Sequence, residues 1–209
     1  MTAPGTLLLT FEFEVPAGWH KLPVDATSTA AAVAEIAERL TDPGETRDQL
    51  ARALAAVSAQ AQAARRHGRP HWAYVPDPAT GRVEALLSVG DIPGDAGSYG
   101  RYLELARVDL DTPESPVAGN PAELINRTTT ESRLALGKVV SIHDFVIQPT
   151  AGGIGDPAVE RAIVALFPDR AARAVECSIV TQNMAQFENV TQYLVDIVST
   201  FRETRVKAS

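Results

Sequence analysis

Two hydrophobic patterns of different period, one near each end of the chain, constrain its fold most strongly. The first places apolar residues at every second position, which predicts a strand with one buried face. Its apolar members are Leu7, Leu9, Phe11, Phe13 and Val15. The second repeats every three or four positions, which predicts an amphipathic helix. Its members are Phe187, Val190, Leu194, Ile197, Val198 and Phe201. We expect this strand and this helix to share one interior, with Asn183 and Gln186 forming a capping box at the helix start.

The residues between these patterns predict further helices and strands. Small and apolar residues recur at helical spacing over residues 27–40 and 45–66. Strands are expected over residues 72–75, 82–89, 102–109, 134–147, 159–167 and 174–181. Turn residues join two pairs of these strands as hairpins. We therefore predict one α/β domain of the α+β type over residues 1–209, in which an antiparallel β-sheet is flanked by helices and the C-terminal amphipathic helix packs on the sheet.

The composition favours one core and argues against two kinds of partner. The chain has 209 residues, of which 45% are hydrophobic, enough for a sizeable interior. Its 19 Lys and Arg residues against 26 Asp and Glu residues give a net charge of −7, which repels nucleic-acid phosphates. No stretch approaches the roughly 20 apolar residues that span a bilayer, and the start has no cationic leader. The single Cys177 suits a reducing compartment, so we expect a cytoplasmic protein that binds neither nucleic acid nor membrane.

Histidines are the first residues to consider for catalysis or metal binding. His67 and His71 have the i, i+4 separation of a metal-binding pair, but a glycine and a proline between them break the helix that this geometry requires. His143 is followed by Asp144, yet successive residues of a strand point to opposite faces, so these two cannot pair with each other.

Other chemical signatures are missing from the sequence. There is no Gly-x-Ser-x-Gly segment, and Cys177 lies in a predicted strand, where a buried thiol is inert. The glycine-rich residues 151–157 lack both the Gly-Lys-Ser/Thr ending and the following helix of a phosphate-binding loop. We therefore predict no catalytic residue, no cofactor and no metal ion.

Three aromatic residues near predicted turns remain as candidate interaction anchors: Trp19, Trp72 and Tyr74. Aromatic side chains bury much area at a small entropic cost and keep a polar group for hydrogen bonding. Packing in the core explains the same residues and is the favoured interpretation.

Three features of the chain resemble PsbP-like α/β sandwich proteins, including small bacterial members. They are the segment Pro16-Ala-Gly-Trp19, the order of elements along most of the chain, and the closing strand-to-helix stretches 174–180 and 195–202. The resemblance implies an antiparallel sheet flanked by helices, in a superfamily whose members mainly bind or assemble with other proteins. It implies no catalytic residues.

The function expected from the sequence is a non-enzymatic role in protein association or assembly, with a protein partner. Two alternatives remain open. An enzyme or small-ligand-binding protein could assemble its site from distant residues, with His20 and His143 as the titratable candidates. The chain could also be a self-assembling subunit that forms a homo-oligomer through the apolar faces of its helices.

Overall fold

A seven-stranded antiparallel sheet forms the centre of the protein. The computed structural model describes residues 7–23, 29–63, 70–92, 97–107, 123–147, 158–169 and 174–207. The strand order across the sheet is β2-β3-β4-β8-β7-β6-β5. The strands are β2 (Trp19–Lys21), β3 (His71–Tyr74), β4 (Ala85–Asp91), β5 (Glu123–Leu134), β6 (Gly137–Ile147), β7 (Ala158–Pro168) and β8 (Val175–Thr181).

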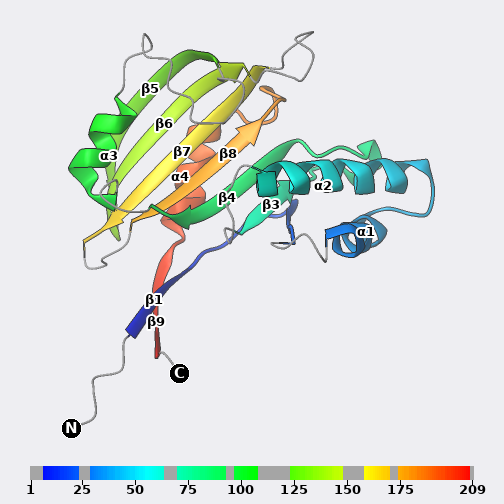
Figure 1. Ribbon diagram of the computed structural model, residues 1–209, viewed down its shortest axis with the longest axis horizontal. Helices are drawn as coiled ribbons and strands as arrows, with labels where there is room; N and C mark the ends of the chain where they lie inside the picture. Colours follow the sequence, from blue (N-terminus) through cyan, green and yellow to red (C-terminus); the bar gives the residue numbers. More distant parts are fainter. Residues whose placement is uncertain are drawn as a thin grey trace.

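Helices cover both faces of this sheet, and a two-stranded ribbon projects from it. The helices are α1 (Thr29–Leu40), α2 (Glu45–Ala63), α3 (Tyr99–Ala106) and α4 (Val190–Ser199), with a short 3₁₀ helix, η1 (Pro78–Thr80). Figure 1 shows α4 behind the sheet and the ribbon of β1 (Leu7–Glu12) and β9 (Arg202–Lys207) extending away from it. None of the described helices is long and apolar enough to cross a membrane.

The largest hydrophobic cluster lies between α4 and the sheet. Leu194 and Ile197 of α4 are buried against strand residues such as Ile179. Phe13 stacks on Phe201 with ring centroids 4.7 Å apart, which attaches the start of the chain to the same cluster. The fold class predicted from the sequence, with a C-terminal helix packed on an antiparallel sheet, is therefore confirmed. The side chain of Phe11 lies outside the described part of the structure.

The opposite face of the sheet carries two separate apolar clusters. One lies where α1 and α2 cover β3 and β4, around Leu50, Leu54 and Ala73. The other lies where α3 covers β6 and β7, around Tyr102 and Phe167. The same face also carries polar and charged residues of β5, β6, β7 and β8, among them Arg127, Asp144, Arg161 and Glu176.

The hairpins predicted from turn residues are present. Strands β3 and β4 pair antiparallel through η1, where the Asp77 side chain accepts a hydrogen bond of 3.0 Å from the Ala79 amide. Strands β7 and β8 also pair antiparallel. The two predicted helices occur as α1 and α2, and α2 is described to Ala63. The turn residues were sufficient to predict the two hairpins, because the paired strands of each hairpin are neighbours in the sequence.

One predicted strand was wrong, and one long strand was not predicted. Residues 102–109 were expected as a strand, but Tyr99–Ala106 is the helix α3. Tyr102 and Ala106, four residues apart, are its buried positions, so a short apolar run was read with the wrong period. Strand β5 was not predicted, because its sequence is polar and lacks apolar alternation. It exists because it pairs along its length with β6.

Further differences concern short elements and a cap. A short strand, β2, forms within residues 16–23 and pairs with β3, although no strand was predicted there. Strand β9 was also not predicted. The cap of α4 is Asn189, whose side chain accepts a hydrogen bond of 2.9 Å from the Gln192 amide, and the expected pair of Asn183 and Gln186 lies before it. Asn183 instead accepts a 3.3 Å hydrogen bond from Ala185 in the preceding turn.

Candidate functional site

Strand β5 forms one edge of the sheet and is the longest exposed strand surface among the described residues. Its partner on one side is β6, and within the described part of the chain no strand lies on its other side. Thr128, Thr130 and Ser132 are exposed on the face that α4 covers, and Glu131 and Arg133 are exposed on the opposite face. We call the outer side of residues 126–134 the β5 edge.

The turn between β5 and β6 decides which backbone groups point outward from this edge. Leu134 pairs with Gly137 across a two-residue loop, and the residues that flank such a loop form a hydrogen-bonded pair. Hydrogen-bonded and non-hydrogen-bonded pairs then alternate along an antiparallel ladder. Counting back from Leu134, the N–H and C=O groups of Arg127, Thr129 and Glu131 point away from β6. The β5 edge therefore presents a row of outward donors and acceptors, which other chains can pair with.

A row of three charges crosses the sheet and ends at this edge. Arg161 of β7, Asp144 of β6 and Arg127 of β5 are directly opposite one another in the register. Arg161 donates to both carboxylate oxygens of Asp144, at 2.8 and 2.7 Å, and Arg127 donates to one of them at 3.2 and 2.8 Å. The Asp144 side chain is 0% exposed, against 19% for Arg127. The carboxylate therefore holds Arg127 in a defined position at the rim of the sheet.

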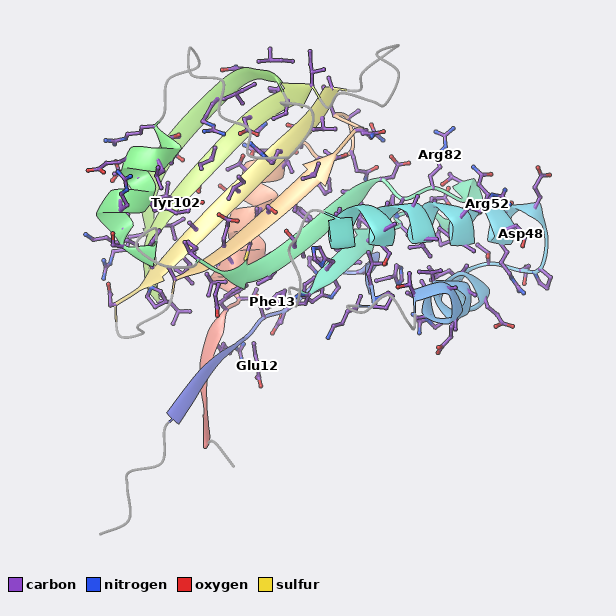
Figure 2. All side chains as sticks on the ribbon, in the orientation of Figure 1. Glu12, Phe13, Asp48, Arg52, Arg82 and Tyr102 are labelled. Atoms are coloured by element: carbon purple, nitrogen blue, oxygen red, sulfur yellow. The ribbon has the colours of Figure 1, made fainter. Side chains whose placement is uncertain are left out.

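The surroundings of this row balance its charge. Tyr102 of α3 donates a 2.9 Å hydrogen bond to Glu176 of β8 on the same face, and Figure 2 shows Tyr102 beside the strands that α3 covers. Burial, followed by the Glu176 carboxylate, raises the pKa of Tyr102 well above its ordinary value, which keeps the hydroxyl protonated as a donor. The charges of the two arginines, Arg127 and Arg161, and of the two carboxylates, Asp144 and Glu176, sum to zero. The cluster orders the sheet and gives no net attraction for an anion.

A second polar pair lies on the α4 side of the sheet. His143 Nε2 is 2.8 Å from an Oε1 oxygen of Glu160 in the adjacent strand β7. Glu160 is buried, and its Oε2 atom has no hydrogen-bond partner among the described residues, whereas a third of the His143 side chain is exposed. The prediction that His143 and Asp144 point to opposite faces is confirmed, because Asp144 contacts the arginines and His143 contacts Glu160.

His20 and His143 do not share a site. His20 lies on β2, opposite Ala73, on the face that α1 and α2 cover. His143 lies on β6, opposite Ala162, on the face that α4 covers. Four strands separate β2 from β6 in the sheet. Burial, followed by the positive charge of Arg39, lowers the pKa of His20.

The three candidate aromatic anchors belong to, or pack against, the hydrophobic cluster between α4 and the sheet. Trp19 is buried, its Nε1 atom donates a 2.9 Å hydrogen bond to the Tyr193 hydroxyl, and its ring lies 4.9 Å from that of Tyr74. The Trp72 ring lies 5.2 Å from that of Phe13. Core packing accounts for these contacts. A role of the half-buried Trp72 and Tyr74 in binding a partner stays a prediction.

The remaining sequence candidates contribute no assembled site. His67, the basic residues 65, 66 and 69, and the glycine-rich residues 151–157 lie outside the described residues. Cys177 is buried among apolar residues, as expected. Among the described residues there is no group of three or more side chains that could hold a metal ion.

Sequence reasoning missed Arg127, Arg161 and Glu160. The signal available was a buried-strand sequence, Val-Val-Ser-Ile-His-Asp-Phe-Val-Ile, in which an aspartate stands among apolar neighbours and requires a cation. Which cation serves depends on the register of β5 and β7 with β6, and that register is not visible in the sequence.

Comparison with known proteins adds no relationship. No protein-family model matches this chain, and no curated protein matches it. The resemblance to PsbP-like proteins therefore stays a prediction.

Proposed function

We propose that this protein is a non-enzymatic association module that binds its partner through the β5 edge. The observation that carries the proposal is a 12-residue edge strand, Glu123–Leu134, whose side chains between residues 126 and 133 are exposed on the α4 face and exposed or half-buried on the opposite face. Addition of a strand to an exposed sheet edge is a common mode of protein recognition, in which main-chain hydrogen bonds supply affinity and alternate side chains supply specificity.

The sequence of the strand fits this role. Natural proteins protect a bare edge with lysines, prolines, bulges or very short strands. Strand β5 has one irregularity, between Leu124 and Asn126, and beyond it the strand pairs regularly with β6 as far as Leu134. Three consecutive β-branched residues, Thr128 to Thr130, favour an extended backbone there. The resemblance to PsbP-like proteins supports the same general function, and the single Cys177 supports a cytoplasmic setting.

Photo-crosslinking in the native cell tests this proposal. A photoreactive amino acid replaces Thr130, which is exposed at the β5 edge, and a control replaces Arg52, which is exposed on α2. We expect a discrete crosslinked species from position 130 and none of the same mass from position 52. Equal products from both positions, or none from position 130, would remove the support for the edge as a binding surface.

A second candidate function rests on His143 and Glu160. A buried carboxylate beside a partly exposed imidazole at 2.8 Å is an arrangement that can move a proton to or from a bound small molecule. A small-molecule screen by thermal shift tests this candidate, with Glu160→Gln and His143→Gln as variants. A ligand that stabilises the natural chain and neither variant would favour it over association. A screen without such a ligand would count against it.

A further inference from the structure

We infer that the partner at the β5 edge is a second copy of this chain, whose β5 strand pairs antiparallel with the first about a two-fold axis at Thr129. This inference rests on the proposed function of the β5 edge and names its occupant. It follows from the symmetry of the strand sequence, the direction of its backbone groups and the charges that meet across the axis.

Residues 127–131 read Arg-Thr-Thr-Thr-Glu, which is self-complementary in charge. When two such strands run antiparallel about Thr129, Arg127 of each copy is opposite Glu131 of the other, and Thr128 is opposite Thr130. Opposite charges directly across a strand pair stabilise it, and β-branched pairs also do so. A two-fold axis makes each of these contacts twice.

The backbone of β5 is compatible with this axis. Arg127, Thr129 and Glu131 have N–H and C=O groups that point away from β6, as the hairpin register requires. The same three residues face their equivalents or one another across the proposed axis. Each facing pair can therefore exchange two hydrogen bonds, and the two sheets join into one without a change in the existing ladder.

The charges already present continue in the right order across the new boundary. Within one copy the row runs from Arg161 through Asp144 to Arg127, so it ends at the edge on a cation. The next residue outward in the joined sheet is Glu131 of the second copy. In its own chain Glu131 accepts hydrogen bonds from Arg107 and Tyr99, so the alternation of sign continues beyond it.

Other registers that keep side chains on matching faces are poorer. An axis at Thr130 places Arg127 opposite Arg133, and an axis at Glu131 places two glutamates together, so like charges face each other. An axis at Thr128 places Glu131 opposite Ile125, so Glu131 and Arg127 no longer face each other. An axis at Ser132 pairs only the last few residues. The axis at Thr129 combines the longest overlap with opposite charges.

Two exposed apolar residues, Ile125 and Leu105, also lie near this edge. Among the described residues the exposed large hydrophobic side chains are Leu105, Ile125 and Met184. Ile125 lies on β5 itself, and Leu105 precedes Ala106 of α3, whose carbonyl accepts a 3.0 Å hydrogen bond from Thr129. A second copy at the edge would cover apolar surface that is otherwise in contact with water.

Sedimentation velocity of the full chain over a concentration series tests the inference, with Thr129→Pro and Thr129→Ala as a matched pair. Both variants lose the side-chain hydrogen bond to Ala106, but only proline removes the outward N–H, which β6 does not use. One lost hydrogen bond weakens binding about fivefold, so the two lost across the axis raise the dissociation constant by roughly 25-fold or more. We expect Thr129→Ala to stay within about threefold of the natural chain.

A charge variant tests the register, and circular dichroism melting confirms that every variant is folded. Glu131→Lys places lysine opposite Arg127 twice, so its dimer should be weak at low salt and strengthen as salt is added, since screening reduces repulsion. The natural dimer should weaken under the same change. Identical salt dependence of the two, or equal weakening by Thr129→Pro and Thr129→Ala, would overturn the proposed pairing.

The outcome also separates this inference from the proposed function. A natural chain that remains monomeric at all concentrations, with a crosslink from position 130 to a different protein, would reject the second copy and keep the β5 edge as a binding surface. A monomeric chain with no crosslink from position 130 would reject both.

Discussion

The carboxylate of Asp144 is fully buried and accepts hydrogen bonds from two arginines, so its loss should strongly destabilise the sheet. We predict that Asp144→Asn lowers the free energy of unfolding by about 3 kcal/mol. Asparagine keeps the volume of the side chain, so no cavity is added and the loss reports on charge. The substitution leaves Arg127 and Arg161 on the same face without their shared anion.

The size of this loss depends on how far the two arginine side chains can be hydrated after the substitution. Removal of one partner from a fully buried ion pair costs roughly 3–5 kcal/mol. The side chains of Arg127 and Arg161 are 19% and 28% exposed, so each guanidinium can be partly hydrated after the change. The expected loss therefore lies at the lower end of that range. The exposed pair of Arg133 and Asp169 provides a matched control, because Asp169→Asn should cost less than about 1 kcal/mol.

Urea unfolding near neutral pH, followed by tryptophan fluorescence and circular dichroism, measures both variants. All samples require the same protein concentration, because dimer formation adds to the apparent stability. An unchanged m-value would show that the loss reflects the native state. A loss for Asp144→Asn no larger than that for Asp169→Asn would refute the reasoning, since it would mean that water already solvates the row of charges.

Three further predictions concern the backbone, the pH dependence and the core, and each is measured by chemical or thermal unfolding. Gly137→Ala places a Cβ 2.1 Å from the Phe167 carbonyl oxygen and should lower the free energy of unfolding by roughly 1–3 kcal/mol. Gly100→Ala in α3, where the added Cβ has no atom within 4 Å, should be neutral or stabilise by up to about 1 kcal/mol. The reverse order would contradict the close approach of β6 and β7. Because the folded pKa of His20 is lowered from 6.5, its contribution to stability is complete above pH 6.5 and is lost as the pH falls toward the folded pKa. His20→Gln should therefore reduce the decline of stability in acid. Parallel curves of stability against pH for the natural chain and the variant would contradict this prediction. Leu194→Ala, at a fully buried position of α4, should cost about 3 kcal/mol, and a loss below about 1 kcal/mol would mean that α4 is loosely packed.

Elements with a strong local pattern were predictable. Four of the six predicted apolar residues of the closing helix, Val190, Leu194, Ile197 and Val198, are the ones that α4 buries on the sheet. Phe187 and Phe201 are also buried, but they lie just outside the helix. The turn residues between β3 and β4 predict the hairpin that these two strands form. In both cases the information lies within a short segment, because a helix or a tight hairpin forms contacts between residues that are close in the sequence.

The β5 edge was not predictable in the same way. Its residues show no apolar alternation, so a local pattern gives no reason for a strand. It is extended because β6 offers a complete set of hydrogen-bonding partners. His143 could be placed on the face opposite Asp144, because successive side chains of a strand alternate between faces. Its contact with Glu160 could not be foreseen, because it depends on the register of β6 with β7.

The sequence by itself determined the secondary structure and the apolar face of the segments with a strong local period, such as α4 and the strands β6, β7 and β8, because side-chain period is a local property. Only the tertiary structure decided that Arg161, Asp144 and Arg127 form one row, and that this row ends at the strand that forms the edge of the described sheet. Strand order and register arise from the packing of the sheet between α4 on one face and the other helices on the opposite face. A shift of one residue in that register would move every side chain of a strand to the other face and separate these charges.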